Sequence, residues 1–452
     1  MELLKRIENY AQIEPQRLAL DIDTEQMTYD SLNERVKAAA SRLPKEVTYL
    51  DVALLFSRVQ DFIVAYLAVL SKGGTPWIVD ANWTASRKKT LYETYKIPYV
   101  WEEGTLYQRH KLSRKSISKE VLHVGFTSGT TGLPKAFLRD EESWIASFEQ
   151  NETLMTSRLK ENHTFVALGP YAHSLTLYVM IYALFYGRTF LGQNDYDIER
   201  CARHIEHHTD KCSLFLVPTM AYDWLQHASQ NHNITEVFIS GDKLTEQLHQ
   251  SLKERLPLAA IYEFFGTSEA SFISVNINQT APLNSVGKVF SNVQVDIRHK
   301  DEQGVGQLFV KSPMMFSGYL GEASPEWIET GDYARLTEGH LYLHGRLQDM
   351  LIIGGKNVYP SIIEQQLKQL KGVQDVIIVR APHTKFGEIA IALYTGTVTL
   401  TYRHMRTQLE KVLSRYEIPS QWIHVQELPY TSSGKVSRQI AQYLYERGDF
   451  HE

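Results

Sequence analysis

The feature that most constrains the fold is a repeated alternation between apolar runs of strand length and segments with helical periodicity. Residues 61–70 (DFIVAYLAVL) are typical of a buried helix, Gly73 and Gly74 are expected to end it, and an extended run follows at 76–79. Four more short runs rich in β-forming residues each precede a loop: 121–126, 212–217, 237–240 and 260–264. This alternation predicts an α/β fold, in which ligand loops usually lie at strand ends.

The chain becomes richer in turns between residues 286 and 342. Short strands are expected at 293–298 and 307–310, and no long helix is expected in this stretch. A smaller β-rich subdomain is therefore predicted to follow the large α/β region.

A second α/β stretch occupies the C-terminal part of the chain. Its pattern predicts two helices and a strand, near 361–370, 403–414 and 376–379. We place the domain boundary near Gln348, which gives an N-terminal domain over 1–347 and a C-terminal domain over 348–452.

Composition narrows the class of protein. The 47 basic and 52 acidic residues give a formal charge of −5, so neither nucleic acid nor an anionic membrane is expected as the main partner. Two cysteines, Cys201 and Cys212, cannot build a disulfide framework or a four-cysteine metal site. No membrane span and no signal peptide are apparent. We expect a soluble protein of the cytoplasm, as a monomer or homodimer.

The strongest local signal is the segment 126–135, FTSGTTGLPK. A strand opens here into a loop of small and hydroxyl-bearing residues, whose backbone N–H groups are free to face phosphate oxygens. The loop is not a Walker loop, because no Gly-Lys-Ser/Thr triplet closes it. The alternative is a surface turn. The candidate nucleotide-binding residues are Thr127, Ser128, Gly129, Thr130, Thr131, Gly132 and Lys135, and Thr127 is also a catalytic candidate.

This loop resembles the signature loop of the adenylate-forming superfamily, which includes acyl-CoA synthetases, peptide-synthetase adenylation domains and beetle luciferases. The chain is similar in particular to bacterial fatty-acid or aryl acyl-CoA ligases. The resemblance implies a large N-terminal α/β domain with a β-rich subdomain and a small mobile C-terminal lid. It also implies two half-reactions: a carboxylic acid and ATP, with Mg²⁺, form acyl-AMP and pyrophosphate, and the thiol of coenzyme A then displaces AMP.

A second motif, FGTSE at 265–269, resembles the family's aromatic-Gly-x-Thr-Glu segment. The resemblance implies that Phe265 stacks on adenine, that Gly266 and the Ser268 hydroxyl contact the nucleotide, and that Glu269 is a catalytic residue and the magnesium ligand. Aromatic rings suit stacking, and carboxylates suit Mg²⁺. Phe265 stands where tyrosine is commoner, and Ser268 where threonine is usual. Both substitutions keep the required chemical group.

Three further residues follow the family pattern near the predicted domain boundary. By resemblance, the carboxylate of Asp332 accepts hydrogen bonds from both ribose hydroxyls, an arrangement that suits a charged acceptor. Arg346 also meets the ribose. Gln348 occupies the hinge position, where relatives carry Asp or Lys. A hinge needs backbone freedom rather than a given charge, so the domain rotation is still expected.

The C-terminal region supplies the remaining implied roles. Residues 429–438 (PYTSSGKVSR) resemble the family loop that carries the catalytic lysine, here Lys435. Its ammonium would offset charge at the carboxylate and α-phosphate. The thiol-acceptor channel is expected to be bordered by Gly354, Gly355, Lys356 and Asn357.

Two weaker assignments concern the acid pocket. His173 lies where relatives carry a histidine or aromatic residue that gates the pocket, and we assign it a catalytic role; a structural histidine is the alternative. Gly241 is expected against the base or the acyl chain. The segment after His173 is apolar, and Ala172 stands at its start, so no aspartate marks an α-amino group. A fatty or aryl acid is therefore expected, with a medium-chain or aromatic acid favoured by the chain's length.

Two rival functions remain open. A stand-alone adenylation enzyme would load the phosphopantetheine arm of a carrier protein in place of free coenzyme A. A catalytically degenerate protein would bind nucleotide without turnover. The second is disfavoured because the key polar residues are all present: Lys135, Glu269, Asp332, Arg346 and Lys435.

Overall fold

The computed structural model describes most of the chain: residues 1–23, 25–44, 50–109, 117, 120–127, 134–155, 163–208, 210–397, 401–430 and 436–450, without the side chains of 402 and 404. These residues form two compact units, each built from two stretches of chain. The first unit contains Met1–Gln294 and Val310–Ile328, and the second contains Val295–Phe309 and Glu329–Glu452. The α/β class expected from the sequence is confirmed.

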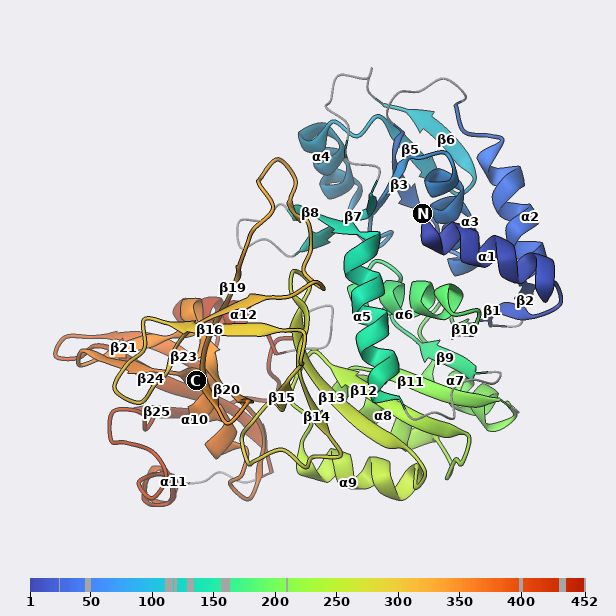
Figure 1. Ribbon diagram of the computed structural model, residues 1–452. Coiled ribbons are helices and arrows are strands. Elements are labelled where there is room, and N and C mark those ends of the chain that lie inside the picture. The colour runs from blue at the N-terminus through green and yellow to red at the C-terminus, as the bar shows by residue number, and fades with distance from the viewer. Residues whose placement is uncertain are drawn as a thin grey trace. The chain divides into compact units, whose positions relative to one another are not determined.

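The first unit contains a sheet whose central strands are parallel (Figure 1). Its order is β15-β14-β13-β12-β11-β9-β10-β1-β2, and strands β2, β14 and β15 run antiparallel to their neighbours. The strand bounds are β1 Leu18–Ile22, β2 Glu25–Thr28, β9 His163–Ala167, β10 Thr189–Gly192, β11 Lys211–Leu216, β12 Ile234–Ser240, β13 Ala260–Thr267, β14 Ser271–Ile277 and β15 Lys288–Val289. The predicted runs at 212–217, 237–240 and 260–264 correspond to β11, β12 and β13.

Helices cover both faces of this sheet. On one face, Trp224 and the apolar residues of three helices pack on Val166, Leu214 and Val237: α7 Ile198–Glu206, α8 Pro218–His227 and α9 Glu246–Arg255. Side chains alternate along a strand, so the neighbouring residue Phe165 lies on the opposite face. There its ring contacts Tyr182 of helix α6, Ser174–Phe185.

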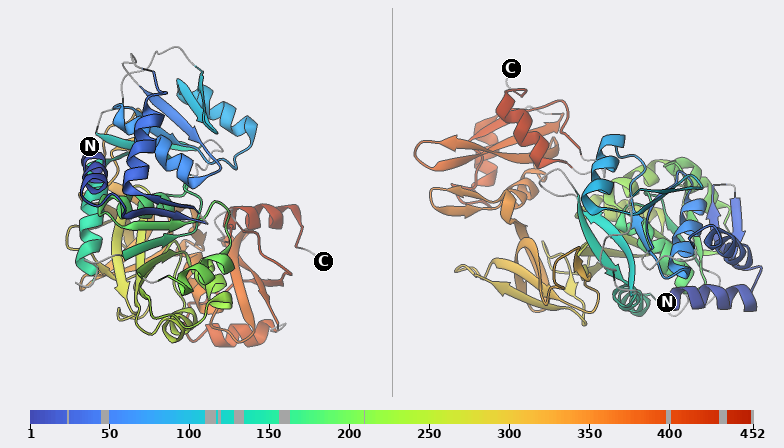
Figure 2. Two further views of the ribbon diagram at one scale, coloured as in Figure 1. Left: turned by 90° about the vertical axis from the view of Figure 1, so that its right-hand side faces the viewer. Right: turned by 90° about the horizontal axis from the view of Figure 1, so that it is seen from above.

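A second sheet in the first unit has the order β18-β8-β7-β4-β3-β5-β6. Its strands are β3 Asp51–Leu55, β4 Thr75–Ile78, β5 Tyr99–Glu102, β6 Thr105–Gln108, β7 Val121–Thr127, β8 Lys135–Asp140 and β18 Gly318–Tyr319. The remaining helices of this unit are α1 Glu2–Ile13, α2 Tyr29–Ala40, α3 Val59–Ser71, α4 Ala85–Tyr95 and α5 Glu141–Leu154. Helices α1, α2 and α3 pack side by side, drawn in blue in Figure 2.

Helix α3 shows how the sequence pattern produces this packing. Ten of its thirteen residues are buried, as expected for a helix that is apolar on all sides. The helix ends at Ser71, and Gly73 follows with a left-handed φ of 68°. Glycine adopts this conformation without a Cβ penalty, so the predicted end of the helix is confirmed.

The second unit begins with four neighbouring strands in the order β16-β17-β19-β20. Their bounds are β16 Gln294–Arg298, β17 Gly306–Lys311, β19 Ile328–Thr337 and β20 His340–Arg346, and the short 3-10 helix η2 Leu347–Asp349 follows. The two short strands predicted at 293–298 and 307–310 are confirmed as β16 and β17.

A further sheet in the second unit has the order β22-β21-β24-β23, and β25 also pairs with β24. The strands are β21 Leu351–Ile353, β22 Lys356–Val358, β23 Val373–His383, β24 Gly387–Gly396 and β25 Gln421–His424, and the helices are α10 Pro360–Leu367, α11 Tyr402–Leu409 and α12 Arg438–Arg447. Helices α10 and α12 both contact β23. The helix expected near 403–414 is shorter than predicted. The functional boundary at Gln348 stays a prediction, because the two units divide the chain elsewhere.

Candidate active site

The two ends of the predicted phosphate loop are held together by strand pairing. Thr127, the last residue of β7, lies opposite Lys135, the first residue of β8. The Tyr95 hydroxyl donates a hydrogen bond of 2.9 Å to the Pro134 carbonyl and accepts one of 3.2 Å from the Ala136 amide. The predicted residues Ser128, Gly129, Thr130, Thr131 and Gly132 lie outside the described part of the chain.

The segment 265–269 follows directly from strand β13. Phe265 is paired with Ser274 of β14 and is partly exposed. A Cβ at Gly266 would lie 2.1 Å from the backbone oxygen of Ser271, so only glycine fits between these strands. The Thr267 hydroxyl then accepts a hydrogen bond of 3.0 Å from the Ala270 amide, which closes the turn. The chain folds back tightly at this point and presents Ser268 and Glu269 at the carboxyl end of the strand.

Glu269 is fixed by contacts from residues far away in the sequence. Its carboxylate oxygen Oε1 accepts a hydrogen bond of 2.7 Å from the Tyr319 hydroxyl. Its backbone carbonyl accepts a hydrogen bond of 2.7 Å from the Phe316 amide. The structure therefore joins the predicted metal ligand to the segment around β18.

Arg139 reinforces the same connection. Its buried guanidinium donates to the backbone carbonyl of Ser268 and, over 2.8 Å, to that of Met314. Burial lowers the pKa of Arg139 to about 10, while the carboxylates of Asp140 and Glu269 oppose this shift. Arg139 therefore stays charged at neutral pH and stabilises both segments through charge-assisted hydrogen bonds.

Arg139 and Tyr319 were not identified from the sequence. Arg139 lies four residues beyond the phosphate loop, where nothing in the local pattern distinguishes it from a surface arginine. Tyr319 belongs to an ordinary Gly-Tyr pair. Their roles depend on strand pairings that bring residues 139, 269 and 319 together, and a local pattern carries no information about such pairings.

The predicted ribose ligands lie together in the second unit. Asp332 of β19 is paired with Arg346 of β20, and the Arg346 Nε lies 3.5 Å from the carboxylate oxygen Oδ1. The Asp332 amide donates to the Thr330 hydroxyl over 3.1 Å. The other carboxylate oxygen, Oδ2, is buried and has no hydrogen-bond partner among the described residues. Burial raises the pKa of Asp332, and the charge of Arg346 opposes this rise.

A buried carboxylate oxygen without a partner is costly and calls for an explanation. The carboxylate suits a ligand with hydroxyl donors. Two such donors would replace the hydrogen bonds to water that the carboxylate loses on burial. The pair formed by Asp332 and Arg346 therefore fits the diol of a ribose.

The proposed hinge and thiol-channel residues also belong to the second unit. Gln348 lies in η2, and its backbone carbonyl accepts a hydrogen bond of 3.0 Å from Arg380. Gly354 and Gly355 form the turn between β21 and β22 with left-handed φ values of 57° and 77°. The exposed residues Lys356 and Asn357 follow this turn. Lys435 lies outside the described residues.

The residues assigned to the acid pocket belong to the first unit. His173 directly precedes α6, and burial lowers its pKa while Asp80 opposes the shift. Its imidazole is therefore favoured in the neutral form. Gly241 follows β12 with a φ of 100°, a conformation that glycine accepts readily. Both residues follow parallel strands of one sheet at their carboxyl ends, where ligands bind in α/β folds.

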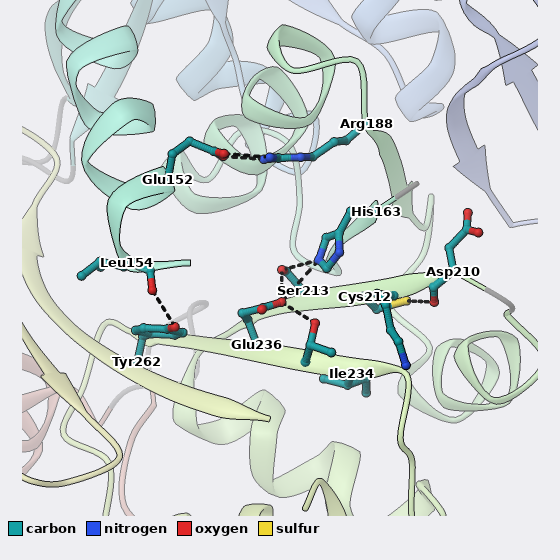
Figure 3. Close-up of polar contacts among 12 residues, drawn as sticks. Glu152, Leu154, His163, Arg188, Asp210, Cys212, Ser213, Ile234, Glu236 and Tyr262 are labelled. Atoms are coloured by element: carbon teal, nitrogen blue, oxygen red, sulfur yellow. Dashed lines mark hydrogen bonds and ion pairs between the residues drawn. The ribbon is translucent and has the colours of Figure 1, made fainter. Parts of the chain in front are cut away.

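A buried polar cluster is formed by His163, Ser213 and Glu236, which come from three neighbouring strands of this sheet (Figure 3). His163 Nε2 lies 2.7 Å from the Ser213 hydroxyl and 3.4 Å from Glu236 Oε2, and Ser213 also donates to Glu236 over 3.0 Å. His163 is the first residue of β9, so the cluster is at the amino ends of the strands. It resembles a nucleophile–histidine–carboxylate set in composition only. Its burial and position assign it to the stabilisation of the sheet.

Two absences hold for the described ranges. No helix there is long and apolar enough to cross a membrane. No group of three or more histidine, cysteine, aspartate or glutamate side chains there is arranged to hold a metal ion. Any metal at Glu269 would therefore take most of its ligands from elsewhere, as Mg²⁺ does when it binds through one or two carboxylates and the phosphates of a nucleotide.

The fold and the family to which the chain belongs are those of the adenylate-forming class of enzymes. The sequence profile of the AMP-binding enzyme family matches residues 7–101 and 99–320, and that of the AMP-binding enzyme C-terminal domain matches 362–435. The chain belongs to the family of AMP-binding enzymes, so the resemblance recognised in its motifs is confirmed.

Full-length relatives support this membership. A Staphylococcus haemolyticus protein with the provisional name long chain fatty acid-CoA ligase VraA is 44% identical over 463 residues, covering 100% of this chain and 99% of that protein. The Staphylococcus epidermidis 2-succinylbenzoate–CoA ligase is 26% identical over 462 residues, with 96% of each chain covered.

Solved structures show the same fold. O-succinylbenzoate coenzyme A synthetase (MenE) from Bacillus subtilis, in complex with AMP, superposes with a TM-score of 0.82 at 19% identity, covering 96% of this chain and 97% of that one. ATP-bound MatB from Rhodopseudomonas palustris gives a TM-score of 0.81 at 19% identity, with coverages of 98% and 99%. The expected acyl-CoA synthetase-like architecture is confirmed.

Proposed function

We propose that this protein is an ATP-dependent acid–thiol ligase that activates a fatty or aryl carboxylic acid as acyl-AMP and transfers the acyl group to coenzyme A. The observation that carries the proposal is the convergence of Thr127, Lys135, Glu269 and Tyr319 in the first unit. It brings the ends of the loop proposed to bind phosphate next to a carboxylate suited to magnesium. Membership of the AMP-binding enzyme family and the names of the full-length relatives support the same reaction.

The nucleotide would be held at several points. Lys135 and the loop beginning at Thr127 would contact phosphate oxygens, and the Phe265 ring would stack on adenine. Asp332, with its buried oxygen unpaired among the described residues, and Arg346 would hold the ribose. These roles follow the family motifs residue by residue.

Glu269 would hold Mg²⁺ through its carboxylate. Among the described residues, oxygen Oε1 carries the hydrogen bond from Tyr319, and no hydrogen bond reaches Oε2. One oxygen is thus oriented by the protein while the other is suited to a cation. The bound ion would supply electrostatic neutralisation of the polyphosphate.

The chemistry of the first step needs no protein nucleophile. A carboxylate oxygen of the acid attacks the α-phosphorus of ATP, the bond to the bridging oxygen breaks, and pyrophosphate leaves. Lys435 would stabilise the negative charge that develops at the α-phosphate. In the second step the coenzyme A sulfur attacks the acyl carbon and AMP leaves with the bonding pair. Rotation about Gln348 would bring residues 354–357 to the thiol channel.

The acid is expected to be apolar. Ten of the twelve residues of α6, which follows His173, are buried and mostly hydrophobic, and no aspartate precedes them to bind an α-amino group. The provisional name of the 44% identical relative refers to a long-chain fatty acid. A fatty acid is therefore the first candidate substrate, with aryl acids as the second.

The test is acid-dependent exchange between ATP and pyrophosphate over fatty, aryl and amino acids, with Glu269→Gln as the matched inactive control. We expect exchange with apolar acids and its loss, or a much higher magnesium requirement, in the variant. Coenzyme A should then convert the acyl-AMP into thioester and AMP. Exchange without AMP release by coenzyme A would favour a carrier-protein acceptor. Nucleotide binding without exchange for any acid would refute the ligase function.

A further inference from the structure

Tyr319 is held in place by backbone hydrogen bonds on both of its sides. It is paired with Phe137 in the antiparallel pairing of β18 with β8. The Ser317 amide donates to the Leu138 carbonyl, and the Leu320 amide donates to the Ala136 carbonyl, both over 2.9 Å. Tyr319 is therefore fixed to the strand that begins at the phosphate loop, although about 180 residues separate the two segments.

The Tyr319 hydroxyl connects the two halves of the proposed phosphate and metal site. It donates to Glu269 Oε1 over 2.7 Å, and it lies near the Thr127 side chain at the start of the loop. Burial, together with the neighbouring Glu269 carboxylate, raises the pKa of Tyr319. The phenol O–H is the donor in the hydrogen bond to the carboxylate.

The Tyr319 ring makes a separate contact. The Lys135 ammonium lies 5.1 Å from the ring centroid, within the range of a cation–π interaction. One side chain thus contacts the last residue of the loop, Lys135, through its ring and the carboxylate that would hold magnesium through its hydroxyl.

We propose that Tyr319 is a positioning residue: its hydroxyl orients the Glu269 carboxylate for magnesium, and its ring separately holds Lys135 for the phosphates of ATP. This inference rests on the proposed function, because it requires Glu269 to bind the metal. Hydrogen-bond donors that orient metal-ligating carboxylates commonly change metal affinity 10- to 100-fold when they are removed. A phenol that only filled space would have no such effect.

The two contacts can be separated by substitution. Tyr319→Phe removes the hydroxyl and keeps the ring over Lys135, whereas Tyr319→Leu removes both. Tyr107→Phe is the matched control, since this tyrosine is exposed on β6 and outside the proposed site. Glu269→Gln reports on the metal ligand itself.

Two measurements are made on each variant. The first is the Mg²⁺ concentration that gives half-maximal ATP–pyrophosphate exchange. The second is calorimetric affinity for ATP with Mg²⁺ and for ATP with EDTA, which does not depend on turnover. We expect Tyr319→Phe to raise the half-maximal Mg²⁺ concentration about 10-fold or more and to weaken MgATP selectively. Tyr319→Leu should in addition weaken metal-free ATP about two- to fivefold.

The outcomes separate this inference from the function on which it rests. If Glu269→Gln shifts the magnesium requirement and Tyr319→Phe does not, the positioning role is refuted and the ligand assignment stands. If Glu269→Gln shifts nothing, the ligand assignment fails and the inference fails with it. If Tyr319→Phe acts through the hydrogen bond to Glu269, the double variant Tyr319→Phe/Glu269→Gln should need no more Mg²⁺ than Glu269→Gln alone. Equal losses of metal-free ATP binding in Tyr319→Phe and Tyr319→Leu would refute the role of the ring.

Discussion

Substitution of Asp332 by asparagine should stabilise the ligand-free protein at neutral pH while weakening its hold on nucleotide. The Asp332 side chain is 9% exposed, and its oxygen Oδ2 has no hydrogen-bond partner among the described residues. Arg346 lies 3.5 Å away, but its side chain is 57% exposed. An ion pair with so exposed a partner contributes only about 0–1 kcal/mol, so its loss should be outweighed by the removal of a buried charge.

The pH dependence of stability shows in which direction the substitution acts. Burial raises the pKa of Asp332 in the folded state above its unfolded value of 3.8. Such a carboxyl group contributes stability that is fully present below the unfolded pKa and is lost as the pH rises through the folded pKa. An asparagine side chain at this position does not titrate. The stability of Asp332→Asn relative to the wild type should therefore increase as the pH rises from 4 to neutrality.

The substitution Asp332→Asn should weaken nucleotide binding. Hydrogen bonds to a charged group contribute about 1.5–3 kcal/mol each, against about 0.5–1.5 kcal/mol for neutral partners. The two hydrogen bonds to the ribose hydroxyls would thus weaken by about 2–3 kcal/mol together, which lowers affinity roughly 30- to 150-fold.

The assay compares the thermal midpoints of the wild type and Asp332→Asn between pH 4 and 8, with calorimetric ATP titration at neutral pH. Asp296→Asn is the control, because Asp296 pairs with Arg298 at the surface of the same unit. It should leave nucleotide affinity unchanged. Destabilisation by Asp332→Asn at every pH would show that attraction to Arg346 exceeds the cost of burial. Unchanged ATP affinity would remove Asp332 from the site.

Three other substitutions test separate parts of the molecule. Lys435→Ala should slow acyl-AMP formation about 10²- to 10³-fold but leave thioester release from synthetic acyl-AMP near the wild-type rate; equal losses in both steps would contradict the two-conformation mechanism. Arg139→Met leaves two backbone carbonyls without their charged donor and should cost about 2–6 kcal/mol in urea unfolding, with partial recovery in Arg139→Lys; a wild-type midpoint would rule out the anchoring role. Glu236→Ala leaves its buried histidine and serine partners unsatisfied and should cost about 2–5 kcal/mol without changing exchange kinetics in the folded protein; a specific kinetic loss would connect this cluster to catalysis.

The sequence predicted the elements whose local pattern is strong. The apolar helix at 61–70 and the strands at 121–126 and 212–217 are found within one or two residues of their expected bounds, because burial on all sides requires continuous apolar runs. The helix expected at 403–414 ends at Leu409. Its C-terminal half has polar residues with no clear helical stop, so periodicity alone placed the end too far along the chain.

Candidate site residues could be proposed from the sequence where they belong to one short motif. Thr127, Lys135 and Glu269 stand in motifs whose residue types indicate their chemistry. Tyr319 and Arg139 could not be found in this way. Their importance arises when β18 pairs with β8 and places one tyrosine beside two segments that are remote in sequence.

The discontinuity of the two units has a consequence for the order of folding during synthesis. The chain leaves the first unit after Gln294, contributes 295–309 to the second, and returns for Val310–Ile328. A nascent chain that ends near residue 294 already contains the phosphate loop and Glu269, yet it lacks β18 and hence Tyr319. The ribosome must therefore release part of the second unit before the first can form the hydrogen bond between Tyr319 and Glu269. Truncation at Gln294 should yield a product whose large sheet can form but whose Glu269 carboxylate lacks the hydrogen bond from Tyr319.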